Sequence, residues 1–256
     1  MPRRLVRLAA FGVAAVAAGA LALSAAPASP AASLTAAHHA MSFAPPRIGT
    51  TLHAGDLVRH GFNEDGGNWS GYAAQGSGFS SVTSSWVEPA VTCNSTDDLF
   101  APWVGIDGYG SATVEQTGVA TDCSSGRPVY QGWYEMYPAS PVYYSNPAAA
   151  GDQISATVTR SGVNYTLTLT DNTQGWSKTT NQTPTATNAS VEVIMESPTA
   201  AYPNFGSVNF TGSQVDGGTL GDTGPVALDA SNSGGFEDHT SALSGGTNFS
   251  ISYLRE

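Results

Sequence analysis

The sequence predicts an all-β protein built from two antiparallel sheets packed face to face. Turn-forming residues are frequent, with 29 glycines and 15 prolines among 256 residues, which is typical of many short strands joined by turns. Beyond Asn68, apolar and polar residues alternate with a period of two almost throughout, and no stretch of helical period separates the alternating runs. This pattern favours a β-sandwich or jelly roll, and it excludes a helical bundle and a parallel βαβ architecture.

The clearest strands lie in the second half of the chain. Apolar residues occupy alternate positions in residues 154–159 and 165–170, and a third alternating run closes the chain at 249–253. Large aromatic or acidic side chains also alternate in Trp103–Asp107, Val129–Tyr137 and Val191–Glu196. We therefore expect one face of one sheet to form a groove lined by these side chains.

The N-terminus has the pattern of a secretory signal. Arg3, Arg4 and Arg7 precede an apolar run over residues 8–23, and small residues follow it. The run is shorter than the roughly 20 residues of a membrane-spanning helix, so a membrane-anchored form is the weaker alternative. We predict that residues 1–32 are a signal peptide and that the protein is secreted and extracellular.

Residues 33–67 differ from the rest of the chain. They are rich in Ala, Pro and His, they have no clear period, and they hold four of the five histidines, His38, His39, His53 and His60. Two interpretations stay open, a flexible linker or a prosegment that is cut away on activation. Residues 68–256 are long enough to bury one core, and we predict that they form a single domain that acts as a monomer.

Charge excludes several classes of partner. The whole chain carries a net charge of −11, and residues 68–256, with four basic and 17 acidic residues, carry −13. Such a surface repels phosphate backbones and anionic lipid, so neither nucleic acid nor a membrane is an expected partner. Carboxylates that repel one another at neutral pH are neutralised in acid, which suits a protein that works at low pH.

The chain has only two cysteines, Cys93 and Cys123. In an exported protein such a pair most simply forms a disulfide, here closing a loop of about 30 residues that is worth roughly 3 to 4 kcal/mol. A nucleophilic thiol is the minor alternative.

Several kinds of catalytic site are excluded by the residues present. No HExxH or G-x-S-x-G motif occurs, and His239 is the sole histidine after residue 60, so neither a zinc site nor a Ser-His-Asp triad is expected. We expect His239 on a solvated loop, and we interpret Asp222-Thr223-Gly224 as a turn because an aspartic peptidase needs two such triplets. Carboxylates remain, and they suit hydrolysis by activated water without metal or cofactor.

Two strand segments contain candidate residues. Period-two alternation places Glu192, Ile194 and Glu196 on one face of a strand. Taken alone, Glu196 fits an exposed strand end before Pro198, and Gln116 fits a polar partner between neighbouring strands.

A resemblance changes these two interpretations. Six motifs occur in the order and near the spacing of the glutamic peptidases, the peptidase G1 or eqolisin family, namely Asn68–Tyr72, Trp103–Gly108, Glu115–Val119, Trp133–Pro138, Glu192–Glu196 and Phe205–Phe210. The resemblance implies a concanavalin-like sandwich with a concave active-site sheet. It also implies a secreted endopeptidase that acts in acid on proteins or peptides.

The resemblance implies roles for five residues. Gln116 and Glu196 match the catalytic pair, and we expect them on neighbouring strands. Glu196 would activate water and then protonate the leaving amine, while the Gln116 amide stabilises the oxyanion. Trp103, Asp107 and Tyr134 match residues that line the site and contact substrate, so that Glu135 should face the other side of the sheet.

This chain departs from the family at two positions. Ala120 stands where relatives have an Asp, which leaves the pH optimum open, and Val193 stands where they have a Trp, which alters the packing expected under Glu196. Two alternative functions stay open, a jelly-roll glycoside hydrolase and a non-catalytic carbohydrate-binding sandwich. Glu192 and Glu196 are about 13 Å apart along a strand, farther than the roughly 5 to 9.5 Å between glycosidase carboxylates.

Overall fold

The computed structural model describes residues 41–46 and 61–255. The expected signal peptide and all four histidines of the expected prosegment lie outside the described residues. Within the described part, the chain forms strands and one short 3₁₀ helix, η1 (Leu220–Thr223), and no α-helix. No described helix has the length and apolar character needed to cross a lipid bilayer.

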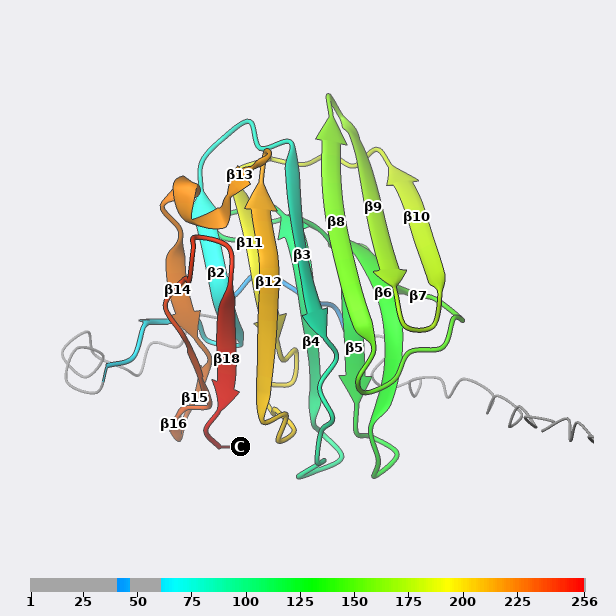
Figure 1. Cartoon of the computed structure of the whole chain (residues 1–256), viewed down its shortest axis with the longest axis vertical. Helices are drawn as coiled ribbons and strands as arrows, with labels where there is room; N and C mark the ends of the chain where they lie inside the picture. The colour runs from blue at the N-terminus through cyan, green and yellow to red at the C-terminus, as the bar shows by residue number, and fades with distance from the viewer. Residues whose placement is uncertain (1–40, 47–60, 256) are drawn as a thin grey trace, which may run out of the picture. The chain divides into compact units, whose positions relative to one another are not determined.

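Two large sheets are packed against each other (Figure 1). In order across the first sheet, the strands are β1 (Glu64–Asp65), β14 (Val226–Asp229), β2 (Trp69–Gln75), β11 (Ser190–Glu196), β4 (Leu99–Ile106), β5 (Val114–Asp122), β6 (Val129–Tyr137) and β7 (Val142–Tyr143). Every pair of neighbours is antiparallel except β1 and β14.

The second sheet covers one face of the first. Its strands, in order, are β10 (Trp176–Gln182), β9 (Asn164–Asp171), β8 (Gln153–Ser161), β3 (Ser81–Val87), β12 (Ser207–Val215), β18 (Phe249–Tyr253) and β17 (Asp238–Thr240), with β13 (Gly218–Thr219) beside β12. A separate ribbon joins β15 (Ser231–Asn232) to β16 (Gly235–Phe236). The all-β sandwich expected from the sequence is therefore confirmed.

The main core lies between the two sheets. Strand β8 buries alternate residues over 154–158 and leaves the residues between them only partly buried, as its sequence predicts, and β9 shows the same alternation. Their buried residues belong to one apolar cluster with residues of the first sheet, among them Val191, Val193 and Met195 of β11. Val193 therefore packs between the sheets, on the opposite face of β11 from Glu196, and not under Glu196 as expected.

A second apolar cluster lies on the other face of the first sheet. It contains Trp69, Trp103, Trp133 and Ile194, and all four are fully buried. Phe43, from the described segment 41–46, belongs to the same cluster. This face carries aromatic side chains at the alternating positions from which a lined groove is predicted, and we call it the groove.

Two smaller expectations concern chain connections. Cys93 and Cys123 form a disulfide, with Cα atoms 5.7 Å apart, as predicted. Asp222 and Thr223 lie in η1, which Gly224 ends in a left-handed conformation (φ 63°), so the Asp-Thr-Gly triplet is a turn.

The expectation that His239 lies on a loop is wrong, although its side chain is solvated, with 40% of its surface exposed. His239 lies in β17, paired with β18, and its Nδ1 is 3.0 Å from the buried carboxylate of Asp229. The Gly- and Ser-rich surroundings suggested a loop, but pairing with a distant strand forms β17. Asp229 also accepts hydrogen bonds from Asn63, at 2.8 Å from both the backbone and the side-chain nitrogen, so the folded unit includes residues before 68.

Candidate active site

Gln116 and Glu196 point to the same face of the first sheet. Gln116 lies in β5 and Glu196 ends β11, and β4 lies between these two strands, so they are not on neighbouring strands as expected. Their positions alternate in phase with Val114 and Ile194 of the outer apolar cluster. Both side chains are fully buried.

The two side chains contact one peptide group of the segment 41–46. The Gln116 amide Nε2 donates a hydrogen bond to the carbonyl oxygen of Phe43. The backbone N–H of Ala44 donates to Glu196 Oε1, at 3.0 Å. Because this carbonyl and this N–H belong to the same peptide bond, Gln116 and Glu196 lie at the two ends of the Phe43–Ala44 peptide group.

Glu135 joins this arrangement from β6. It is opposite Gln116 in the register of β5 and β6, and its Oε2 accepts hydrogen bonds from Gln116 Nε2 at 2.9 Å and from the Phe43 N–H at 3.0 Å. The carboxyl group thereby fixes which end of the Gln116 amide faces the Phe43 carbonyl. Glu135 also anchors the backbone one position before the contacted peptide bond.

Two residues at the start of β2 complete the contacts. Asn68 Nδ2 donates to Glu196 Oε1 at 3.1 Å, and Trp69 Nε1 donates to the carbonyl oxygen of Ala44 at 3.1 Å. Since β2 pairs with β11, with Trp69 opposite Glu196, the register of these strands places both donors beside the carboxyl group.

Two buried oxygen atoms of the pair have no hydrogen-bond partner among the described residues. They are Gln116 Oε1 and Glu196 Oε2, the atoms not used to hold the peptide group. A buried acceptor without a partner is rare and costs free energy. Through these two oxygens, the Gln116 amide and the Glu196 carboxyl group can each accept a hydrogen bond from a further ligand.

Aromatic rings form the walls of the groove. The ring of Phe43 stacks on Trp133, with ring centroids 4.1 Å apart, and Trp69 meets Trp103 edge to face at 4.9 Å. Gly105 of β4 makes room for this packing, because a Cβ there would lie 2.8 Å from the Trp103 ring and 3.2 Å from the Gln116 Cβ. Trp103 thus lies in the groove, on the face where the sequence places it.

Tyr134 is not in the groove, and the expected substrate contact has no support in its position. Its ring packs against the core between the sheets, 5.9 Å from the ring of Tyr144. Tyr134 and Glu135 do face opposite sides of the sheet, as alternation predicts. The sides are exchanged, however, because Tyr134 was expected in the groove and Glu135 outside it. Glu135 and Trp133 occupy the groove face, because Gln116 and Gly118 are opposite them in β5.

Asp107 lies just after β4 and holds the loop that leads into β11. Its carboxylate accepts hydrogen bonds from three consecutive backbone N–H groups, those of Thr187 at 2.9 Å, Asn188 at 2.6 Å and Ala189 at 2.7 Å. Asp107 itself has a left-handed backbone conformation with φ 70°. These contacts fit a supporting role, in which Asp107 fixes the start of the strand that carries Glu196.

Burial makes the carboxyl groups of the groove weak acids. It raises the pKa of Glu196 well above its ordinary value, and the neighbouring Glu135 raises it further, while the Ala44 N–H and the indoles of Trp103 and Trp69 oppose the shift. Burial also raises the pKa of Glu135 to about 8, against the hydrogen bonds from Ser42, Phe43 and Gln116. Both groups therefore favour the protonated form while the segment covers them.

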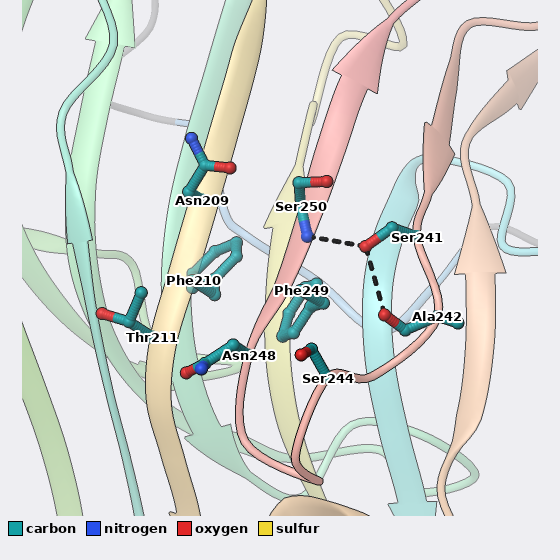
Figure 2. A pocket seen from close by; sticks show the side chains of 9 residues that line it. All are labelled: Asn209, Phe210, Thr211, Ser241, Ala242, Ser244, Asn248, Phe249 and Ser250. Carbon is teal, nitrogen blue, oxygen red and sulfur yellow. Dashed lines mark hydrogen bonds between the residues drawn. The ribbon is translucent and has the colours of Figure 1, made fainter.

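A hollow on the second sheet offers no comparable chemistry. It lies between β12, β18 and the loop before β18, and Figure 2 shows Phe210 and Phe249 side by side at its floor, with serine and asparagine side chains around them. The hollow has a volume of about 270 Å³, and none of the residues that line it is ionisable. It therefore lacks an acid or a base for hydrolysis.

Sequence reasoning missed five contributors to the groove, one of which is Glu135, expected on the other face of the sheet. Asn68, Trp69 and Trp133 stand in motifs already singled out, but nothing in a motif tells which side chain points at the site. The segment 41–46 had one usable signal, since Phe43 is the only Phe, Tyr or Trp in residues 33–60.

Comparisons with known proteins identify the family of this chain. The sequence model of the peptidase A4 family matches residues 67–253, and no curated protein sequence matches the chain. A crystal structure of scytalido-glutamic peptidase with a transition state analog inhibitor is 25% identical, with a TM-score of 0.64 over 73% of this chain and 98% of that one.

Two further solved structures are similar. Aspergilloglutamic peptidase from Aspergillus niger is 27% identical, with a TM-score of 0.53 over 61% of this chain and 99% of that one. SCP-B, a member of the eqolisin family in a complex with the tripeptide Ala-Ile-His, is 24% identical, with a TM-score of 0.59 over 73% and 98% of the two chains, and this supports the fold alone. The resemblance noted in the sequence is confirmed: the chain belongs to the peptidase A4 family, the eqolisins, and is a glutamic peptidase.

Proposed function

We propose that this protein is a secreted endopeptidase that hydrolyses peptide bonds in acid, with Gln116 and Glu196 as its catalytic residues. One observation carries the assignment of the pair. The two side chains hold opposite ends of a single peptide group, with the amide at the carbonyl oxygen and the carboxyl group at the nitrogen. When the peptide bond is hydrolysed, the carbonyl oxygen gains negative charge and the nitrogen gains a proton, so each side chain lies at an atom that it can assist.

The chemistry follows from these positions. Glu196 reacts in its ionised form, which is the minor form while a peptide covers it. It takes a proton from a water molecule that donates hydrogen bonds to Glu196 Oε2 and to Gln116 Oε1, the two oxygens without a partner among the described residues. The resulting hydroxide attacks the carbonyl carbon, and the Gln116 N–H stabilises the oxyanion. Glu196 then delivers its proton to the leaving nitrogen, so one carboxyl group serves both steps.

Acid suits this pair for two reasons. An amide does not titrate, so the oxyanion donor keeps its function at a pH where a histidine base would be protonated. Glu135, in turn, binds a proton more tightly when a peptide buries it. Peptide binding is therefore coupled to proton uptake and is favoured as the pH falls.

Secretion and the absence of nucleic-acid or membrane partners remain proposals that rest on the N-terminal pattern and the acidic charge. We infer that Trp103 lines the substrate groove and that Asp107 positions β11. We propose that the part of residues 33–67 that includes residues 41–46 is a prosegment rather than a passive linker, because residues 41–46 occupy the groove. Glu64 and Asp65, in contrast, belong to the first sheet.

Digestion of casein or haemoglobin between pH 2 and 7 tests this function. Glu196→Gln keeps the size of the side chain but removes the base, and it should abolish digestion. Glu192→Gln is the matched control, since Glu192 lies on the same face of β11 but accepts its hydrogen bond from Tyr109 at 3.2 Å, and it should remain active. Digestion that persists in Glu196→Gln would contradict the assignment.

A further inference from the structure

We infer that the peptide bond between Phe43 and Ala44 is a bond that this enzyme cuts in its own chain, and that residues 41–46 are bound as a substrate. This inference rests on the proposed function and names one substrate for it, the enzyme's own segment 41–46. It also gives the prosegment a defined point of removal, between residues 43 and 44.

The backbone of the segment is held on both sides of this bond. Before it, the Phe43 N–H donates to Glu135 at 3.0 Å. After it, the Ala44 carbonyl accepts from Trp69 at 3.1 Å. With the contacts from Gln116 and Glu196, every backbone N–H and C=O group of these two residues is bonded to a groove side chain.

The polarity of the contacts is that of a substrate about to react. The carbonyl oxygen, which must gain negative charge, faces an N–H donor, and the nitrogen, which must gain a proton, faces the carboxyl group. Had the segment lain in the opposite direction, its N–H would face the amide donor and its carbonyl the carboxylate. The observed direction is the one that hydrolysis requires.

The side chains next to the bond fit their surroundings. Phe43 is fully buried and stacks on Trp133 at 4.1 Å, so an aromatic residue fills the pocket before the cut bond. On the other side, Pro45 and Pro46 line a hollow of about 400 Å³ with Tyr109 and other residues of the loop after β4. The groove thus continues past the bond and can hold peptide on both sides.

The reaction consumes one water molecule. Its hydroxyl forms a new bond to the Phe43 carbonyl carbon, the bond from that carbon to the Ala44 nitrogen breaks, and the second hydrogen reaches that nitrogen through Glu196. The products are a fragment that ends at Phe43 and an enzyme that begins at Ala44. No oxidant, metal or further reactant is needed.

The test incubates the purified full chain at pH values from 3 to 7 and identifies its ends by N-terminal sequencing and intact mass. Wild-type protein should yield a chain that begins at Ala44, and Glu196→Gln should not. Ala44→Pro removes the N–H that Glu196 contacts and should block this cut even when wild-type enzyme is added. Ala44→Gly, the matched control, keeps the N–H and should still be cut.

A synthetic peptide with the sequence of residues 39–48 provides a second readout with the processed enzyme. It should be cut between Phe and Ala, and replacing Phe with Ala should lower kcat/KM on the order of 10- to 100-fold, because the pocket loses its ring. If casein is digested while chain and peptide are cut only elsewhere, the inference is overturned and the proposed function stands. If wild-type enzyme cuts neither casein nor its own chain, both are overturned.

Discussion

Proton uptake by Glu135 makes a quantitative prediction about substrate binding. With the segment in the groove, the pKa of Glu135 is about 8, against an ordinary value of 4.5. The pKa of Glu135 is therefore higher when a peptide covers the groove, so protonation of Glu135 contributes fully to peptide binding below about pH 4.5. This contribution is lost progressively as the pH rises toward 8.

The size of the effect follows from this shift. If the carboxyl group returns to its ordinary pKa when the groove is open, peptide affinity falls by up to roughly 25-fold between pH 4 and pH 6 through Glu135 alone. Glu135→Gln removes the titration but keeps an oxygen that can accept from the Phe43 N–H or the equivalent group of a substrate. The variant should therefore bind with a flatter pH dependence.

The assay measures KM for a short aromatic peptide at pH 4 and at pH 6 with acid-processed enzyme. The ratio of wild-type KM to Glu135→Gln KM should rise by up to roughly 25-fold between these two pH values, whereas Glu192→Gln should follow the wild type. Equal slopes in wild type and Glu135→Gln would refute the reasoning, because the proton would then be taken up elsewhere.

Three other predictions concern catalysis and stability. Gln116→Ala removes the oxyanion donor and should lower kcat on the order of 10²- to 10³-fold in peptide hydrolysis, with a smaller change in KM. Replacing Cys93 and Cys123 together by serine should lower the free energy of unfolding by about 3 kcal/mol, measured by denaturant titration, whereas no change would show that the disulfide adds nothing. Gly118→Ala places a Cβ 2.2 Å from the carbonyl oxygen of Pro102, so a loss of roughly 1 to 3 kcal/mol or more is expected in the same titration, and wild-type stability would contradict it.

Strands with one buried face could be predicted closely from the sequence. The alternating runs 154–159, 165–170 and 249–253 correspond to β8, β9 and β18, with bounds that differ by two residues at most. Period two is a direct consequence of backbone geometry, so it survives without knowledge of the neighbours.

The phase of a strand could not be predicted in the same way. In β6, Trp133, Tyr134 and Glu135 are all large or polar, and alternation alone does not tell which of them faces the groove. The pairing of Gln116 with Glu135 decides it, and register between distant strands is set by tertiary packing. Strand order is also set by tertiary packing, so the sequence alone could not show that β4 lies between β5 and β11.

The segment 41–46 was beyond pattern reasoning for another reason. It forms no strand and has no period, and its contacts are made by backbone groups, which every residue carries. Only the apolar ring of Phe43 distinguishes it. Composition therefore left a linker and a prosegment both open, because the position of the segment depends on the shape and the hydrogen-bond donors of the groove.

The pairing of β1 with β14 matters after the chain has been cut. Glu64 and Asp65 stay attached to the first sheet, and Asn63 stays bonded to Asp229, so a new end at Ala44 remains tethered to its own groove. A short tether gives an effective concentration in the millimolar range. Freshly processed enzyme should therefore suffer product inhibition from its own N-terminus, and full turnover would begin only when that tail is trimmed or outcompeted.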